Sequence, residues 1–336
     1  MIGEEHRNMF KKNPKEWILF GVFIIVFAVM TALSPSRFLS GTNLQSMVFQ
    51  LPEFGLFALA MTVTILTGGI NLSVITSGTM GSILAATVMS TMYKSGADPT
   101  VTIALAILVA IVSSCAAGAI NGILVSYVGA PAMMATLGTS TLFEGIGLLI
   151  SKGNSISGFP TEFFWFGNGT IIGIPVPMII FVIIAVITFI LLEHTKWGQS
   201  VYMVGCNPTA AKFSGINVGS VMLRVYIYSG FLGGIATIIM MSRYNSARID
   251  YGSSYLMQTV TAAVLGGVAI TGGYGKVIGV VLAVLTLQSI SSGLNIVGVD
   301  TNLSTVITGL LLIGVLAINF ISAMTASKKK TAAKQK

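Results

Sequence analysis

The sequence predicts an all-α integral membrane protein that crosses the bilayer about ten times. Of its 336 residues, 54% are hydrophobic and 8% are charged, and the mean hydropathy is +0.89. A soluble domain carries about 25% charged residues, so this chain has too few polar side chains to cover a surface that faces water. The apolar residues form runs of about 20, the length of one helical crossing. No large soluble domain fits in what remains.

Prolines, glycines and polar residues separate these apolar runs and place the predicted helices in order. The runs are Trp17–Leu33, Leu44–Leu66, Ser73–Tyr93, Thr100–Tyr127, Pro131–Ile150, Ile174–Leu192, Ser220–Met241, Ser254–Ile270, Lys276–Gly293 and Asn302–Ile321. The second run contains Pro52, which predicts a kink. The first follows a basic patch like that of a signal peptide. It is nevertheless long enough to span and no A-x-A-like cleavage site follows, so we expect it to be retained.

The distribution of Lys and Arg predicts that both termini are cytoplasmic, because these residues are enriched in cytoplasmic loops. With ten crossings and both tails inside, thirteen of the 18 basic residues lie inside and five outside. We therefore expect a cytoplasmic tail over 1–16, a transmembrane domain over 17–321 and a basic cytoplasmic tail over 322–336. Within the domain, 151–173 is expected to be an extracytoplasmic loop and 193–219 a cytoplasmic segment.

Charge and reactive residues exclude several classes of function. The net charge of +8 resides at the tails and helix ends, which indicates anionic lipid headgroups and a multi-pass membrane location rather than nucleic acid. His6 and His194 are far apart, and the two cysteines lie in different segments, so no metal site, disulfide or catalytic triad is predicted. Gly275-Lys276 lacks the rest of a Walker A loop. We expect no enzyme activity and no bound cofactor, with any ATP and Mg²⁺ held by a partner.

Polar side chains inside the predicted spans are the candidates for a solute path. An ionised side chain at the bilayer centre costs roughly 2.5 to 3.5 kcal/mol. Glu53, near a helix end, is expected to reach the interface, whereas Glu144 either lines a path or bonds a neighbouring helix. The hydroxyl and amide residues suit an uncharged, hydroxylated solute, although such groups more often join helix to helix. The substrate-path candidates are Asn71, Ser73, Asn121, Thr139, Glu144, Gln258, Gln288 and Asn295.

Glycine patterns predict a tightly packed bundle, because small residues four apart let helices approach closely. The pairs are Gly118 with Gly122, Gly230 with Gly234, and Gly275 with Gly279. In addition, Leu66-Thr67-Gly68-Gly69 is similar to Ile270-Thr271-Gly272-Gly273, and both fall in predicted cytoplasmic breaks. Transporters are often built from repeats, but so short a match also arises by chance.

The cytoplasmic segment around Trp197–Asn217 predicts a short helix of its own. Asn207 is a favourable cap, Pro208 suits the first helical position, and Gly215 suits the end about two turns later. A short helix lying across a cytoplasmic loop is either a docking site for another protein or a connector.

Three blocks of the sequence resemble the ribose-type permeases of ABC importers, which include the transmembrane subunits for xylose, arabinose, galactosides and autoinducer-2. The blocks lie within Gly68–Val74, Gly205–Ile216 and Ala263–Asn295. The spans have similar spacing, so the resemblance covers nearly the whole chain. Two positions depart from the first block, with Asn71 where the family commonly has Asp and Ile75 where it has Gly. In the fifth span, Glu144 stands where family members often have Arg before a glycine.

The resemblance implies a permease of the bacterial inner (cytoplasmic) membrane that imports a ribose-like pentose, a hexose or a similar small polar solute. Its implied partners are ATP-binding subunits, a second permease subunit that is identical or different, and an extracytoplasmic solute-binding protein. The segment 193–219 would be the coupling segment. Its implied contact residues are Gly205, Asn207, Ala210, Ala211, Ser214 and Gly215. The alternative function is that of an ion-coupled secondary transporter or a channel, with ions bound at broken helices.

Overall fold

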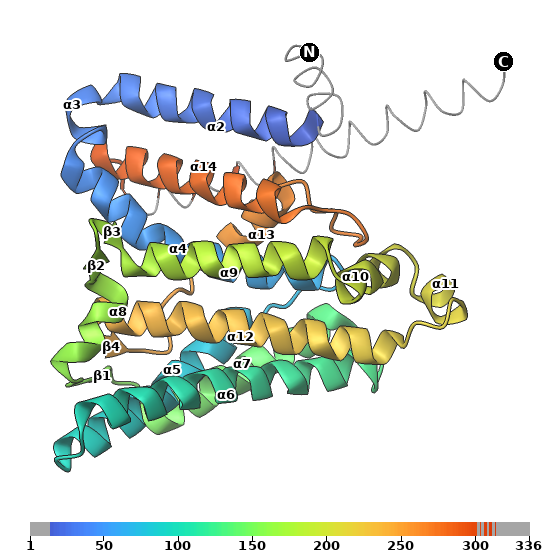
Figure 1. Cartoon of the computed structure of the whole chain (residues 1–336), viewed down its shortest axis with the longest axis horizontal. Coiled ribbons are helices and arrows are strands. Elements are labelled where there is room, and N and C mark those ends of the chain that lie inside the picture. The colour runs from blue at the N-terminus through green and yellow to red at the C-terminus, as the bar shows by residue number, and fades with distance from the viewer. Residues whose placement is uncertain (1–13, 301–302, 304–305, 308, 311–312, 314–336) are drawn as a thin grey trace.

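The computed structural model describes residues 14–300, 303, 306–307, 309–310 and 313, and forms a bundle whose long helices run between two opposite ends (Figure 1). Among the described residues, eight helices are long and apolar enough to cross a membrane. They are α2 (Pro14–Leu33), α4 (Gly41–Ile65), α5 (Val74–Lys94), α6 (Pro99–Ser126), α7 (Ala132–Ser151), α9 (Val176–Glu193), α12 (Val218–Tyr244) and α14 (Val277–Ile296). The prediction of an all-α, polytopic membrane protein is confirmed. The count of ten crossings and the side of the termini stay predictions.

The short elements lie mainly at the two ends of the bundle. They are α3 (Pro35–Phe38), α8 (Trp165–Asn168), α10 (Lys196–Cys206), α11 (Pro208–Phe213), α13 (Tyr255–Leu265), the 3-10 helix η1 (Thr161–Phe164), β1 (Ile156–Ser157), β2 (Thr170–Ile171), β3 (Ile174–Pro175) and β4 (Ser246–Ala247). The strands form two antiparallel pairs, β1 with β4 and β2 with β3. Figure 1 shows α10 and α11 at one end, called here the α11 end, and the strands with α8 at the other, called the strand end.

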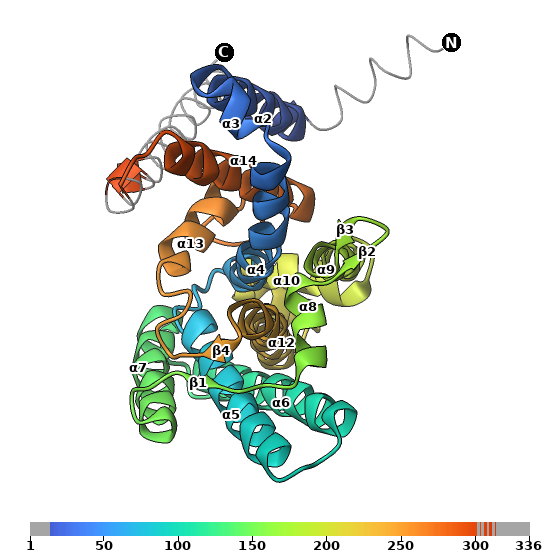
Figure 2. The same cartoon turned by 90° about the vertical axis from the view of Figure 1, so that its left-hand side faces the viewer.

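Helix α4 occupies the centre of the bundle. It contacts α9, α12, α13 and α14, and in the end-on view it lies among them (Figure 2). Every residue from Leu51 to Ile65 is buried, because this stretch combines large apolar side chains with alanines and a glycine that admit neighbours from all sides. The elements that matter below are all placed against α4 or its two ends.

The predicted close approach of glycine-bearing helices is confirmed between α6 and α12. A Cβ added at Gly118 would overlap the carbonyl oxygen of Tyr226, and one at Gly230 would overlap that of Ser114. Any larger side chain would push the two backbones apart. This contact fixes α12 along α6.

The eighth predicted span, Ser254–Ile270, is much shorter than expected. Helix α13 covers 11 residues, about 16 Å at 1.5 Å per residue, whereas the hydrocarbon core is about 30 Å thick. The helix ends because Gly266 and Gly267 follow it. Gly267 has a φ of 85°, a left-handed conformation that glycine adopts without strain. The tenth predicted span, 302–321, falls largely outside the described residues.

Candidate functional site

The α11 end is built as the capping pattern predicts. The side chain of Asn207 accepts a hydrogen bond from the amide of Ala210 (3.0 Å), Pro208 occupies the first position of α11, and Gly215 follows the helix with a φ of 82°. The cap satisfies an amide that has no partner within the helix. The predicted short helix of this segment is therefore confirmed.

Helix α11 presents most of its predicted contact residues to the surface. Asn207, Ala210, Ser214 and Gly215 are exposed, while Ala211 is buried. Sequence reasoning missed Phe213, whose side chain is 89% exposed. The signal in the sequence that could have identified Phe213 is that it is a large aromatic residue among small residues, in a segment outside the membrane-length helices. Aromatic residues are enriched in protein–protein interfaces, so Phe213 joins the candidate docking residues.

Behind α11, the last residues of α10 contact two glycine-containing segments, called here the glycine breaks: Leu66–Gly69 after α4 and Ile270–Gly273 after α13. Their point of contact is called the glycine junction and is formed by Leu66, Gly68, Gly205, Gly272 and Gly273. The amide of Gly273 donates to the carbonyl of Leu66 (2.9 Å). A Cβ at Gly205 would overlap that same carbonyl oxygen, and one at Gly272 would lie 2.6 Å from the amide nitrogen of Gly68. The two similar four-residue segments thus lie side by side. They join the end of α4 to the stretch after α13, with α10 packed against both.

Two side chains of α10 strengthen this junction. The hydroxyl of Tyr202 donates to the carbonyl of Gly275 (2.9 Å), and the thiol of Cys206 donates to the carbonyl of Gly273 (3.5 Å). Burial raises the pKa of Tyr202 to about 12, and the nearby Glu193 carboxylate adds to the shift. The phenol therefore stays protonated and keeps donating across the physiological pH range.

Four of the substrate-path candidates form one buried hydrogen-bonded chain. Asn71 Nδ2 donates to Ser229 Oγ (3.1 Å), Ser73 Oγ to Asn71 Oδ1 (2.9 Å), Asn121 Nδ2 to Ser73 Oγ (2.7 Å), and Thr139 Oγ1 to Asn121 Oδ1 (2.5 Å). The chain links the break after α4 to α6, α7 and α12. These polar groups already have partners within the protein. A direct contact with solute stays a prediction for each of them.

The other four candidates are not brought together. Gln288 is buried and donates to Gln50 Oε1 (3.3 Å), Gln258 is half-buried, and Asn295 is exposed at the end of α14. Glu144 is exposed on α7 and forms no ion pair or hydrogen bond with the part of the chain that the structure describes. It does not bond a neighbouring helix there, and its role in a solute path stays a prediction.

The prediction that Glu53 reaches the membrane interface is wrong. Its side chain is 0% exposed and pairs with Arg243 (3.0 Å), while the hydroxyls of Tyr244 (3.2 Å) and Tyr255 (2.9 Å) donate to the same oxygen, Oε1. The end of α12 and the start of the short helix α13 enclose this turn of α4. The pairing joins residues far apart in the chain, so no local pattern in the sequence predicts it.

Comparison with known proteins decides the family. The model of the family described as the permease component of branched-chain amino acid transport systems matches residues 43–316. The chain belongs to this permease family. No solved structure matches the chain.

Individual relatives agree with this membership. The permease is 38% identical over 297 residues to the ribose import permease protein RbsC of Bacillus subtilis, covering 87% of this chain and 88% of that protein. It is 33% identical over 324 residues to the autoinducer 2 import system permease protein LsrD of Yersinia enterocolitica, covering 94% of each. It is 34% identical over 308 residues to the D-allose transport system permease protein AlsC of Escherichia coli, covering 90% of this chain and 92% of that protein. The resemblance to ribose-type permeases of ABC importers is confirmed, and with it a multi-pass protein of the cytoplasmic membrane.

Proposed function

We propose that this permease is the membrane subunit of an ATP-driven importer for a sugar or a similar uncharged, hydroxylated solute. Two of the relatives described above are named for ribose and D-allose. The polar side chains inside the bundle are mainly hydroxyls and amides, which hydrogen-bond such a solute without a net charge. The permease itself makes and breaks no covalent bond, and ATP with Mg²⁺ binds to the partner subunit.

The observation that carries the proposal is the connection from exposed α11 through α10 to the glycine junction. An ATP-binding subunit docks on Asn207, Ala210, Phe213, Ser214 and Gly215, and its closure on ATP displaces α11. The buried Gly205 passes that displacement to the breaks before α5 and after α13. Changing those two breaks together switches the bundle between its outward-open and inward-open states.

The positions of the other partners follow from how the permease is oriented in the membrane. The α11 end faces the cytoplasm, and the strand end receives the solute from an extracytoplasmic binding protein. A second permease subunit, identical or different, completes the importer and supplies a second α11 for a second ATP-binding subunit.

Reconstituted transport tests this function. We expect proteoliposomes with the permease, its ATP-binding subunit and its binding protein to accumulate D-ribose or D-allose only when ATP is hydrolysed. An ATP-binding subunit that binds but does not hydrolyse ATP is the control and should abolish uptake. Uphill uptake by the permease alone, driven by an ion gradient, would show that it is a secondary transporter.

Docking is tested separately through the exposed aromatic residue. Phe213→Ala is expected to weaken copurification of the ATP-binding subunit by about 30-fold, because truncating a central interface residue costs about 2 kcal/mol. Lys212→Ala, a neighbouring exposed residue, is the matched control and should change binding less than fivefold. Equal, unchanged binding by both variants would contradict the docking role of Phe213.

A further inference from the structure

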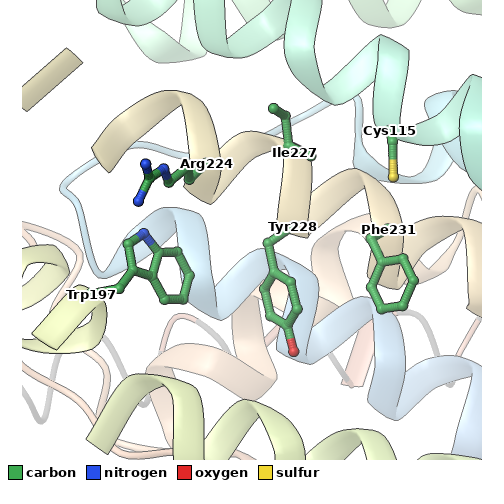
Figure 3. Close-up of a pocket in the computed structure, with 6 residues that line it drawn as sticks. All are labelled: Cys115, Trp197, Arg224, Ile227, Tyr228 and Phe231. Carbon is green, nitrogen blue, oxygen red and sulfur yellow. The ribbon is translucent and has the colours of Figure 1, made fainter. Parts of the chain in front are cut away.

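A groove with a volume of about 350 Å³ lies on the side of the bundle, between α6, α10 and α12 (Figure 3). Its lining residues are Cys115, Trp197, Arg224, Ile227, Tyr228 and Phe231. None of them belongs to the glycine junction, the hydrogen-bonded chain or the Glu53 pair. The groove therefore shares no residue with these three features, although Trp197 belongs to α10.

The part of the groove away from Arg224 is apolar. Ile227, Tyr228 and Phe231 occupy one face of α12 at helical spacing, and the aromatic rings of Tyr228 and Phe231 stack with centroids 6.0 Å apart. The Tyr228 hydroxyl is hydrogen-bonded with Thr188 (2.7 Å), so its polar atom already has a partner. From Arg224 to Phe231 this face extends about 10 Å along the helix. It offers a hydrocarbon chain an apolar surface.

The other end of the groove carries two hydrogen-bond donors. Arg224 is exposed and forms no hydrogen bond or ion pair with the described residues. The indole nitrogen of Trp197 is buried, and no acceptor for it lies in the described part of the chain. Figure 3 shows the guanidinium and the indole nitrogen at the same end of the groove, away from Phe231 and Cys115. A buried N–H without an acceptor is costly, and two adjacent donors, one of them cationic, favour an anion with several oxygens.

We propose that this groove binds one anionic phospholipid of the cytoplasmic leaflet. The phosphate accepts hydrogen bonds from the exposed Arg224 and from the Trp197 indole, whose buried N–H is uncovered by a small turn of the ring. An acyl chain lies along Ile227, Tyr228 and Phe231. Arg224 stands six residues after the start of α12, about 9 Å along its axis, on the side of the α11 end. No acidic side chain lines the groove, so the cationic charge favours an anionic over a zwitterionic headgroup.

The lipid has a consequence for coupling, which rests on the proposed function. Trp197 belongs to α10, whereas Arg224 belongs to α12, so one phosphate bridges the coupling segment to the membrane bundle. Transport is then expected to depend on anionic lipid, although binding of the lipid itself needs no ATP-binding subunit. The binding test therefore gives its answer even if the proposed function fails.

Native mass spectrometry of the full-length permease, with phosphatidylglycerol as the probe in phosphatidylcholine, tests the site. Arg224→Ala is expected to weaken retention of phosphatidylglycerol about fivefold, and Trp197→Phe, which keeps an aromatic ring but removes the N–H, about two- to fivefold. Lys196→Ala removes a neighbouring positive charge outside the groove and is the matched control. Equal retention by the wild type, Arg224→Ala and Trp197→Phe would overturn the proposal.

Thiol labelling of Cys115 provides a second measurement of lipid binding, and it requires no substitution of a residue that lines the groove. In a Cys206→Ser background, added phosphatidylglycerol should slow maleimide labelling of Cys115 several-fold, and phosphatidylcholine should not. No protection, or protection equal for both lipids, contradicts an anionic-lipid site. Cross-linking between Cys115 residues of two copies would show that a second permease covers the groove, and would also overturn the proposal.

Discussion

The two ends of the bundle are held together by opposite means. At the α11 end, three chain segments meet backbone to backbone at glycines, and the amide of Gly273 bonds directly to the carbonyl of Leu66. At the strand end, α4, α12 and α13 meet through the side chains of Glu53, Arg243 and Tyr255. The first joint is built mainly from backbone atoms, with side-chain hydrogen bonds from Tyr202 and Cys206, whereas the second depends on charge and hydroxyl groups.

This difference predicts different mechanical behaviour. Where backbones pack directly against each other, no side chain can change its rotamer to absorb a displacement. A shift of α10 is therefore expected to reach both glycine breaks. Removing one partner of a buried ion pair is strongly destabilising, because the remaining charge stays buried without compensation. The α11 end is therefore suited to transmit movement. The strand end is suited to hold α4, α12 and α13 together.

The largest expected effect tests the ion pair at the strand end. Arg243→Ala leaves the buried Glu53 carboxylate without its cation and should lower the free energy of unfolding by about 3–5 kcal/mol, measured by thermal or denaturant unfolding in detergent. Arg248→Ala is the matched control, because Arg248 pairs with Asp250 at an exposed position and should cost about 1 kcal/mol or less. Similar small effects from both variants would refute the importance of the buried pair.

An intermediate effect is expected at the glycine junction. Gly205→Ala places a Cβ against the Leu66 carbonyl and should lower the free energy of unfolding by about 1–3 kcal/mol, with a loss of ATP-driven uptake. Gly138→Ala on α7 is the control. Nothing lies within 4 Å of its added Cβ, and alanine is the better helix former, so it should not destabilise. Normal uptake and stability in Gly205→Ala would break the contrast between the two ends.

The smallest effect is expected at Asn71, where the family commonly has Asp. Asn71 Oδ1 accepts from Ser73, a role that an oxygen of a neutral, protonated Asp also fills, and the O–H of that acid can donate to Ser229 as Nδ2 of Asn71 does. Asn71→Asp should therefore change the melting temperature less than Asn71→Leu, which removes every hydrogen bond of the side chain. Equal losses would show that Nδ2 of Asn71 is required.

Much of the architecture follows from local patterns in the sequence. The apolar runs predict the membrane-length helices because burial in lipid demands continuous hydrophobicity over a fixed length. The cap formed by Asn207, Pro208 and Gly215 predicts α11 because its hydrogen bonds are local. The end of α13 was missed because Gly266 and Gly267 lie inside an apolar run, where hydropathy alone does not mark a helix end.

The sites that depend on tertiary contacts were harder to predict. Glu53 meets Arg243 only after α4, α12 and α13 have packed together, so its burial has no signature in the residues around it. The glycine junction left a weak signal in the likeness of Leu66–Gly69 and Ile270–Gly273. Neither segment indicates by itself that the other is its neighbour. The hydroxyl and amide candidates show that residue type alone does not separate a solute path from helix packing.

The most direct test of the account is cross-linking from α11 in the assembled importer. A cysteine introduced as Ser214→Cys, in a background lacking Cys115 and Cys206, should cross-link to the ATP-binding subunit, with a yield that changes when ATP is bound. The control is Ser95→Cys, directly after the C-terminus of α5, which should give no cross-linked product. Absence of the Ser214→Cys product in an importer that transports would contradict the claim that α11 receives the force of ATP binding.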